Sequence, residues 1–202
     1  MGSIFGRFTD AETYAAILQA DFSRFTGLTT ELAENFRQNG VDYVAGDASE
    51  GYNPAHDLCR LVLNAAVGLV NRHTSNHLRN FDFPLTGRPD DCQHKLLKDA
   101  IRLDLDDTAF ARKVTIAQSY PELLDEVAST VSENGIDAFR RECLRPVCEF
   151  EERYMLEDRP FYERYGERQV AAGVYSKVLR YRQHMFPLAE AIQRHVKRVD
   201  AQ

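Results

Sequence analysis

The chain has 202 residues with 44% hydrophobic and 28% charged residues, which predicts a folded globular protein of ordinary domain size and excludes extensive disorder. Its net charge of −6 gives no global support for binding nucleic acid or anionic lipid. No apolar run approaches the roughly 20 residues of a membrane-spanning helix, so we expect neither nucleic acid nor membrane as a partner.

The N-terminal part of the chain predicts two helices and a strand. Apolar residues at helical spacing predict a helix over 10–25, ended by Gly27. Thr29 is expected to cap a second helix over 30–39. The β-branched and aromatic segment 41–45 predicts a strand.

A third helix is expected to begin at Asn53 and Pro54 and to run to about Arg72. Asparagine is a favoured N-cap, and proline fits the first helical position because its missing N–H needs no partner there. We expect one face of this helix to pack on the strand at Tyr43 and Val44. The apolar residues of that face are Leu58, Leu61, Val62, Ala65, Leu69 and Val70.

The middle of the chain alternates short strands with helices. Segment 80–87 predicts a short edge strand, because Pro84 cannot donate to a ladder. Alternation over 100–105 predicts another strand, followed by Asp106 as the cap of a helix over 107–118.

Three later segments are less regular. Ser119-x-x-Glu122 has the pattern of a capping box for a helix that stops at Gly135. The following segment, 136–147, fits either a strand or a helix. A short helix is expected over 159–165.

The C-terminal segment 167–202 predicts one long helix with a seam. Pro187 is expected to kink this helix. The seam packs either on the chain's own domain or on a second copy in a homodimer. Its residues are Val174, Val178, Tyr181, Met185, Leu188, Ile192, His195 and Val199.

These elements predict an α/β fold, a single helix-rich domain over 1–202 with a small, mainly parallel sheet. A mostly α-helical domain is the alternative. None of the four cysteines forms a C-x-x-C pair. The first residues show no basic region followed by a long apolar segment, so we expect no secretion signal and reduced thiols in a cytoplasmic protein. These cysteines are Cys59, Cys92, Cys143 and Cys148.

The candidate site lies where the first strand passes into the third helix. Asp47, Glu50, His56 and Asp57 fall within eleven positions there, beyond the carboxyl end of a strand, where α/β proteins bind ligands. The helix dipole opposes protonation of a histidine in the first turn, and neutral imidazole is the form that binds metal or acts as a base. Two oxygens and one nitrogen suit a divalent metal.

The same segment resembles a known family. Asn53-Pro54-Ala55-His56 is similar to the H-P-D-H metal motif of the LmbE/PIG-L-like N-acetylglucosaminyl deacetylases, and 103–120 is similar to that family's acid-led helix. The resemblance implies zinc-dependent removal of an acetyl group, with His56 at the position of a zinc ligand. The family's first motif, A-H-P-D-D-E, has no counterpart before Val41.

Together these observations predict a metal-assisted hydrolase, deacetylase-like, acting on a small polar substrate. Asp47 and His56 are the predicted ligands of a divalent metal, zinc first, and Asp57 or Glu50 is the predicted general base. The alternative is a non-catalytic, diverged deacetylase-like protein, or a helical assembly protein that uses its C-terminal helix.

Overall fold

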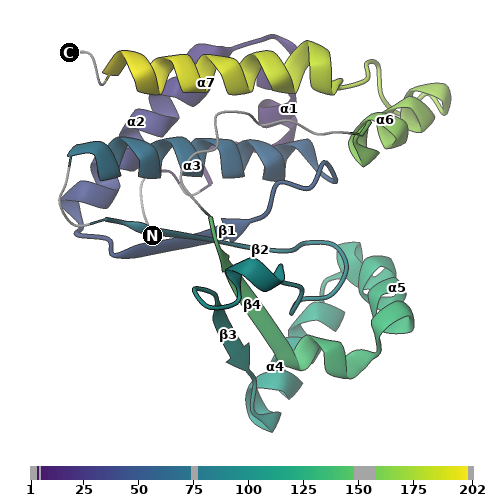
Figure 1. The fold of residues 1–202 in the computed structure, drawn as a ribbon. Helices are drawn as coiled ribbons and strands as arrows, with labels where there is room; N and C mark the ends of the chain where they lie inside the picture. Colours follow the sequence, from purple (N-terminus) through teal and green to yellow (C-terminus); the bar gives the residue numbers. More distant parts are fainter. Residues whose placement is uncertain (1–3, 5, 74–76, 148–157, 200–202) are drawn as a thin grey trace. The chain divides into compact units, whose positions relative to one another are not determined.

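The computed structural model describes residues 4, 6–73, 77–147 and 158–199 (Figure 1). The chain divides into two compact units, one formed by 1–80 and 148–202 and the other by 81–147. The division into two units does not test the prediction of a single domain over 1–202, which stays a prediction. The helix-rich α/β class is confirmed, since seven α-helices and a small four-stranded mixed sheet are present in the described residues.

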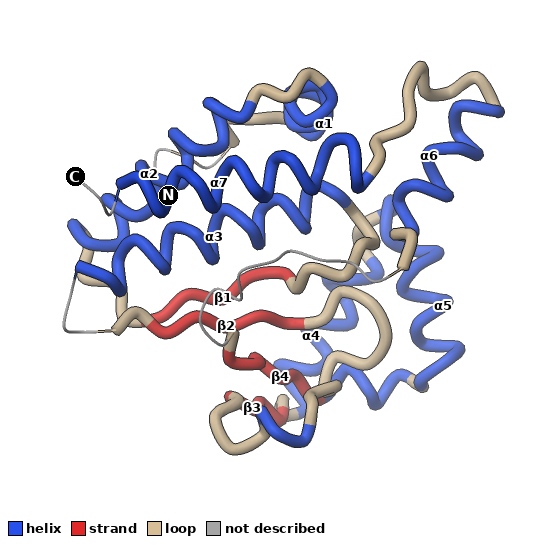
Figure 2. The backbone as a smooth tube through the Cα atoms, turned by 45° about the horizontal axis from the view of Figure 1, so that its top comes forward, coloured by secondary structure: helices blue, strands red, loops and turns tan. Residues whose placement is uncertain are grey.

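Unit 1 is a helical layer over a short strand. Figures 1 and 2 show α3 lying between β1 and the pair formed by α2 and α7. Its elements are α1 (Asp10–Leu18), α2 (Phe22–Gln38), β1 (Tyr43–Asp47), α3 (Pro54–His73), α6 (Phe161–Ala171), a π-helical turn (Tyr181–Met185) and α7 (Phe186–Val199).

The core of unit 1 is the apolar face of α3 packed against its neighbours. Leu61, Val62, Ala65 and Leu69 are all buried, which confirms the predicted stripe. Val44 packs against this core, but Tyr43 is 62% exposed, so the expectation that Tyr43 covers α3 is wrong. Successive side chains of a strand face opposite sides, and Tyr43 faces away from the helix.

The first helix boundary differs from the prediction. Gly27 does not end a helix, and Thr29 caps none: both lie inside α2, and Thr29 is fully buried. The break falls at Ala20, whose φ of +56° is left-handed. The Asp21 carboxylate then accepts the Arg24 N–H and starts α2. Such a cap stabilises a helix end by about 1 kcal/mol, while a mid-helix glycine costs about the same and is tolerated.

Unit 2 places two helices beside an antiparallel pair of strands. Its elements are β3 (Ile101–Asp104), α4 (Asp107–Gln118), α5 (Leu124–Asn134) and β4 (Arg141–Pro146), with 3₁₀ turns at His94–Leu96, Pro121–Leu123 and Ile136–Arg140. The strand over 100–105, the helix over 107–118 and its Asp106 cap are confirmed, as the Asp106 carboxylate accepts the Ala109 N–H at 2.8 Å.

The helix predicted after Ser119 begins later than expected. A 3₁₀ turn occupies Pro121–Leu123, and α5 starts at Leu124 with no side-chain bond at its N-cap. It ends at Gly135, as predicted. The ambiguous segment after Gly135 becomes a 3₁₀ turn followed by β4.

The sheet is mixed, so the prediction of a mainly parallel sheet is wrong. The strand order is β1-β2-β4-β3, and β4 pairs antiparallel with both β2 (Arg79–Phe83) and β3. The predicted edge strand over 80–87 is β2, which is an inner strand. Pro84 directly follows β2, so its missing N–H interrupts no ladder.

The C-terminal segment is not one long helix. The short helix predicted over 159–165 is α6, which begins at Phe161 and extends to Ala171. Gly173, at φ +73°, follows in the left-handed region, and helical structure resumes only at Tyr181. The π-helical turn ends just before Pro187, and the wider turn is one of the ways a helix accommodates proline.

The later part of the predicted seam belongs to the protein's own core, whereas its first residue, Val174, is 64% exposed and lies outside any helix. Met185, Leu188 and Ile192 are at most 1% exposed and pack with α2 and α3 of the same chain. His195, the polar residue of the seam, meets Thr30 of α2 with 2.8 Å between Nε2 and Oγ1. A homodimer through this helix stays a prediction, and it requires another face. Within the described residues, no helix combines the length and apolar composition needed to cross a membrane.

Candidate functional site

The site is built where β1 ends and α3 begins. Asp47 is the last residue of β1, and Pro54 is the first of α3. The Asn53 side chain accepts the Ala55 N–H at 2.9 Å, and its carbonyl accepts the Asp57 N–H at 3.1 Å. This confirms the predicted cap, which fixes the first turn of α3 next to the end of the strand.

Asp47 and His56 form a hydrogen-bonded pair. Their Oδ2 and Nδ1 atoms are 2.6 Å apart, and the side chains are 27% and 42% exposed. The pKa of His56 is raised, chiefly by this hydrogen bond, although partial burial acts in the opposite direction. The expectation that the helix dipole keeps His56 neutral is therefore reversed, because a carboxylate in contact outweighs the partial charge of a helix end.

Asp57 holds the loop and lies away from solvent. It is 1% exposed, and its carboxylate accepts the backbone N–H groups of Glu50 at 3.0 Å and of Gly51 at 3.2 Å. Gly51 has a φ of +68°, in the left-handed region that glycine adopts without strain, and so allows the chain to turn sharply here. Asp57, predicted as a general base, is thus a buried anchor that holds the backbone of Glu50, the other predicted base.

Arg60 is part of the site, and the sequence analysis missed it. It is only 3% exposed, and its Nε donates to the Asp47 carbonyl at 2.6 Å, while Nη1 donates to Asn80 at 3.0 Å and to Asn64 at 3.3 Å. A Cβ on Gly46 would lie 3.0 Å from this guanidinium. The absence of a side chain at Gly46 therefore lets β1 approach α3 closely. The sequence does hold one signal for this role, because Arg60 is a charged residue within the apolar stretch that follows His56.

The predicted three-residue metal site is not assembled. In the residues that the structure describes, no three His, Cys, Asp or Glu side chains lie close enough together to hold a metal ion. Asp47 and His56 come together, but Glu50 does not join them. The pair alone supplies one oxygen and one nitrogen, fewer than the three protein ligands of typical catalytic zinc sites.

Aromatic rings lie along the outer side of the same loop. Tyr52 stacks on Phe161 of α6 with ring centroids 5.0 Å apart, and Tyr14 donates its hydroxyl to Asn53 at 3.1 Å. The Tyr162 N–H at the start of α6 donates to the Gly51 carbonyl at 3.3 Å. The loop is therefore held by α3 on one side and by α6 on the other.

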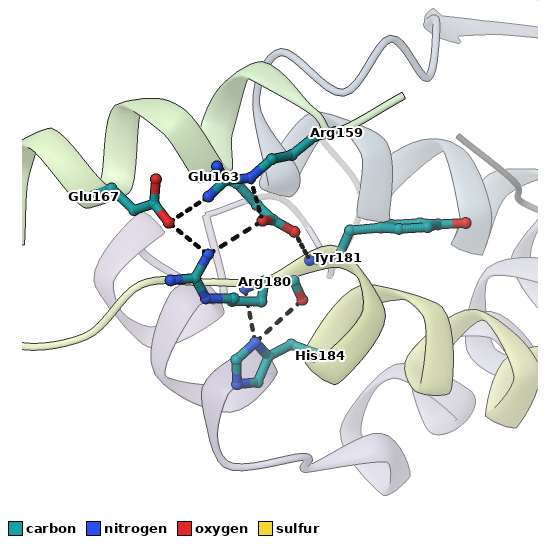
Figure 3. A network of polar contacts seen from close by, with 6 residues as sticks. All are labelled: Arg159, Glu163, Glu167, Arg180, Tyr181 and His184. Carbon is teal, nitrogen blue, oxygen red and sulfur yellow. Dashed lines mark hydrogen bonds and ion pairs between the residues drawn. The ribbon is translucent and has the colours of Figure 1, made fainter. Parts of the chain in front are cut away.

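The position of α6 is fixed by a network of charged side chains (Figure 3). Glu163 accepts the Tyr181 backbone N–H at 2.7 Å and Arg159 Nε at 3.0 Å, and Glu167 accepts from Arg180 at 2.7 Å and from Arg159. Glu163 is 7% exposed. A buried carboxylate with several donors ties α6 to the segment that leads into α7.

Two of the cysteines lie together: burial and a hydrogen bond with the Cys92 side chain raise the pKa of Cys143 to about 11. Cys59, Cys92 and Cys143 are free thiols, and Cys148 lies outside the described residues. Burial lowers the pKa of His195, with a smaller effect from Arg198.

No family model matches this chain, and no curated protein or solved structure matches it either. The resemblance to LmbE/PIG-L-like deacetylases therefore stays a prediction.

Proposed function

We propose that the protein is a hydrolase in which His56 is the general base and Asp47 orients it. The 2.6 Å contact between Asp47 Oδ2 and His56 Nδ1 carries the proposal. A carboxylate on Nδ1 fixes the tautomer of the ring, so that Nε2 bears the lone pair that accepts a proton. Among the described residues, none hydrogen-bonds Nε2.

The chemical steps follow from this tautomer. Nε2 of neutral His56 takes a proton from water as the water oxygen attacks a carbonyl carbon of the substrate. Asp47 stabilises the imidazolium that forms. The imidazolium then returns the proton to the leaving amine as the carbon–nitrogen bond breaks, which releases a carboxylic acid and an amine.

The substrate class is a small polar amide, and removal of an acetyl group fits the resemblance of 53–56 to the deacetylase motif. We place the protein in the cytoplasm. Bound zinc stays a prediction: the described residues do not complete a zinc ligand set, so no step above uses a metal. Elemental analysis of the purified protein tests it.

A non-catalytic role is the second candidate. It is favoured by Asp57 and Arg60, which are both buried and bonded to the backbone of the loop. On this view the polar residues around β1 stabilise a connection between strand and helix. His56→Gln would then change stability without removing an activity.

Acetate release from N-acetylated sugars, followed across pH, separates the two candidates. The general-base mechanism predicts that the rate rises with pH through a pKa above the usual value of about 6.5 and then levels off. His56→Gln should lower the rate by about 100-fold or more, whereas His94→Gln, an exposed histidine in unit 2, should not change it. A wild type without turnover on these substrates, or an active His56→Gln protein, would exclude the deacetylase proposal.

A further inference from the structure

Unit 2 contains a cavity that takes no part in the proposed hydrolysis. Its volume is about 420 Å³, within the range of sites for small ligands. It lies beside the end of α5, the 3₁₀ turn after it and the start of β4. The lining residues are Arg88, Asp90, Asn134, Asp137, Ala138, Arg140 and Arg141.

A backbone contact brings Arg88 to this cavity beside Arg140 and Arg141, which lie about 50 residues later in the sequence. The Pro89 carbonyl accepts the Cys143 N–H of β4 at 3.1 Å, which fixes the turn carrying Arg88 against the strand. Arg140 ends the 3₁₀ turn and Arg141 begins β4. The Arg140 guanidinium lies 4.3 Å from the centre of the Phe110 ring, and that contact limits its freedom.

The charge of the lining contrasts with its surroundings. Residues 81–147 contain nine Lys and Arg against thirteen Asp and Glu, a net charge of −4, yet three arginines and two aspartates line the cavity. The pKa of Asp90 is lowered, chiefly by its hydrogen bond with Arg88 and with a contribution from Arg141. The field inside the cavity thus favours negative charge.

Each of these arginines already has a carboxylate partner, and that of Arg140 is Asp107 at 2.7 Å. Arg88 bonds Asp90 at 3.0 and 3.2 Å, and Arg141 pairs with Asp104 at 3.2 Å, with both arginines at least half exposed. The Arg141–Asp104 pair is exposed on both sides and stabilises little, whereas Arg88 and the mostly buried Asp90 form a stronger two-bond pair. A dianion carries twice the charge of a carboxylate and can bond two guanidinium groups at once, so it can compete with Asp90 and Asp104 for Arg88 and Arg141.

We propose that this cavity binds a small phosphate monoester. Arg88 and Arg141 bind the phosphate oxygens, with Arg140 adding positive charge. Asp90 and Asp137 accept hydrogen bonds from hydroxyl groups on the rest of the ligand. The site belongs to unit 2 alone and does not depend on the Asp47–His56 pair.

Calorimetric titration of the full chain with glycerol 3-phosphate tests the proposal, with glycerol and citrate as comparison ligands at matched ionic strength. The wild type should bind glycerol 3-phosphate with a Kd below about 1 mM and should bind neither comparison ligand. Arg88→Gln and Arg141→Gln should each weaken binding by about tenfold or more. Arg112→Gln, an exposed arginine of α4 outside the cavity, is the matched control and should bind as the wild type does.

Other results would overturn the proposal. Absence of binding by the wild type, equal binding of citrate, or equal weakening by Arg112→Gln would each exclude a phosphate monoester site. Circular dichroism of each variant shows whether it folds. If one of the two arginine variants is unfolded, the other still tests the site. His56→Gln should bind glycerol 3-phosphate as tightly as the wild type does. Binding at this cavity is therefore tested independently of the hydrolase proposal.

Discussion

Replacing Asp57 by alanine tests whether this buried carboxylate anchors the loop of the candidate site. It accepts two backbone N–H groups, from Glu50 and Gly51, at 3.0 to 3.3 Å. A hydrogen bond to a charged group contributes about 1.5–3 kcal/mol, and an orphaned buried donor costs about 1–3 kcal/mol. The Gly51 bonds are buried, whereas the Glu50 bond is only partly buried and water can replace it there. We therefore expect Asp57→Ala to lower the free energy of unfolding by about 2–4 kcal/mol.

Urea denaturation followed by circular dichroism measures this loss, and thermal unfolding should show a Tm lower by about 5–15 °C. Asp57→Asn keeps one acceptor oxygen and should lose about half as much. The matched control is Asp125→Ala, at an exposed position in the first turn of α5, where only the helix dipole acts and about 0.3–1 kcal/mol is expected. A loss for Asp57→Ala within about 0.5 kcal/mol of that control would refute the anchoring role.

Four further outcomes are expected. Because the pKa of His56 is raised in the folded protein, its contribution to stability is fully present below about pH 6.5 and is lost as pH rises through the folded pKa; urea unfolding across pH should show this loss in the wild type and not in His56→Gln. Leu61→Ala should cost about 2–5 kcal/mol in urea, since Leu61 is 5% exposed, and a loss under about 1 kcal/mol would contradict the packing of α3. Gly46→Ala should cost about 1–3 kcal/mol by crowding a buried guanidinium, and unchanged stability would show that β1 can move away. The double variant Met185→Asp, Ile192→Asp should be unfolded by circular dichroism. If sedimentation instead shows a wild-type dimer that becomes a folded monomer in the variant, these residues form a dimer interface and not the core.

Local signals predicted the elements that depend on neighbouring residues. Asn53 and Pro54 supply a cap and a preset first turn, and Asp106 supplies a cap, so the starts of α3 and α4 were predicted from sequence. The boundary between α1 and α2 was not, because Ala20 carries no sign of a left-handed conformation that the surrounding packing imposes.

In the candidate site too, local sequence signals predicted some contacts and tertiary packing determined others. The nine-residue spacing of Asp47 and His56 across a strand and a helix predicted that they meet. The role of Arg60 depends on how closely β1 approaches α3, and that distance is set by Gly46 and by tertiary packing. The antiparallel pairing of β4 was equally out of reach, since register and direction arise from contacts far apart in sequence.

Unit 1 is assembled from two stretches of chain with the whole of unit 2 between them, and this order has a consequence during synthesis. The core of α2 and α3 is closed by Leu188 and its neighbours on α7, which leave the ribosome about 120 residues after α3. At about 5–20 residues per second that delay is about 6–25 s. Unit 2 can reach its own fold during this interval, while the first half of unit 1 still exposes the apolar surface that its last helix will cover. A newly made chain is therefore most prone to aggregation, and most dependent on chaperones, in the seconds before α7 emerges.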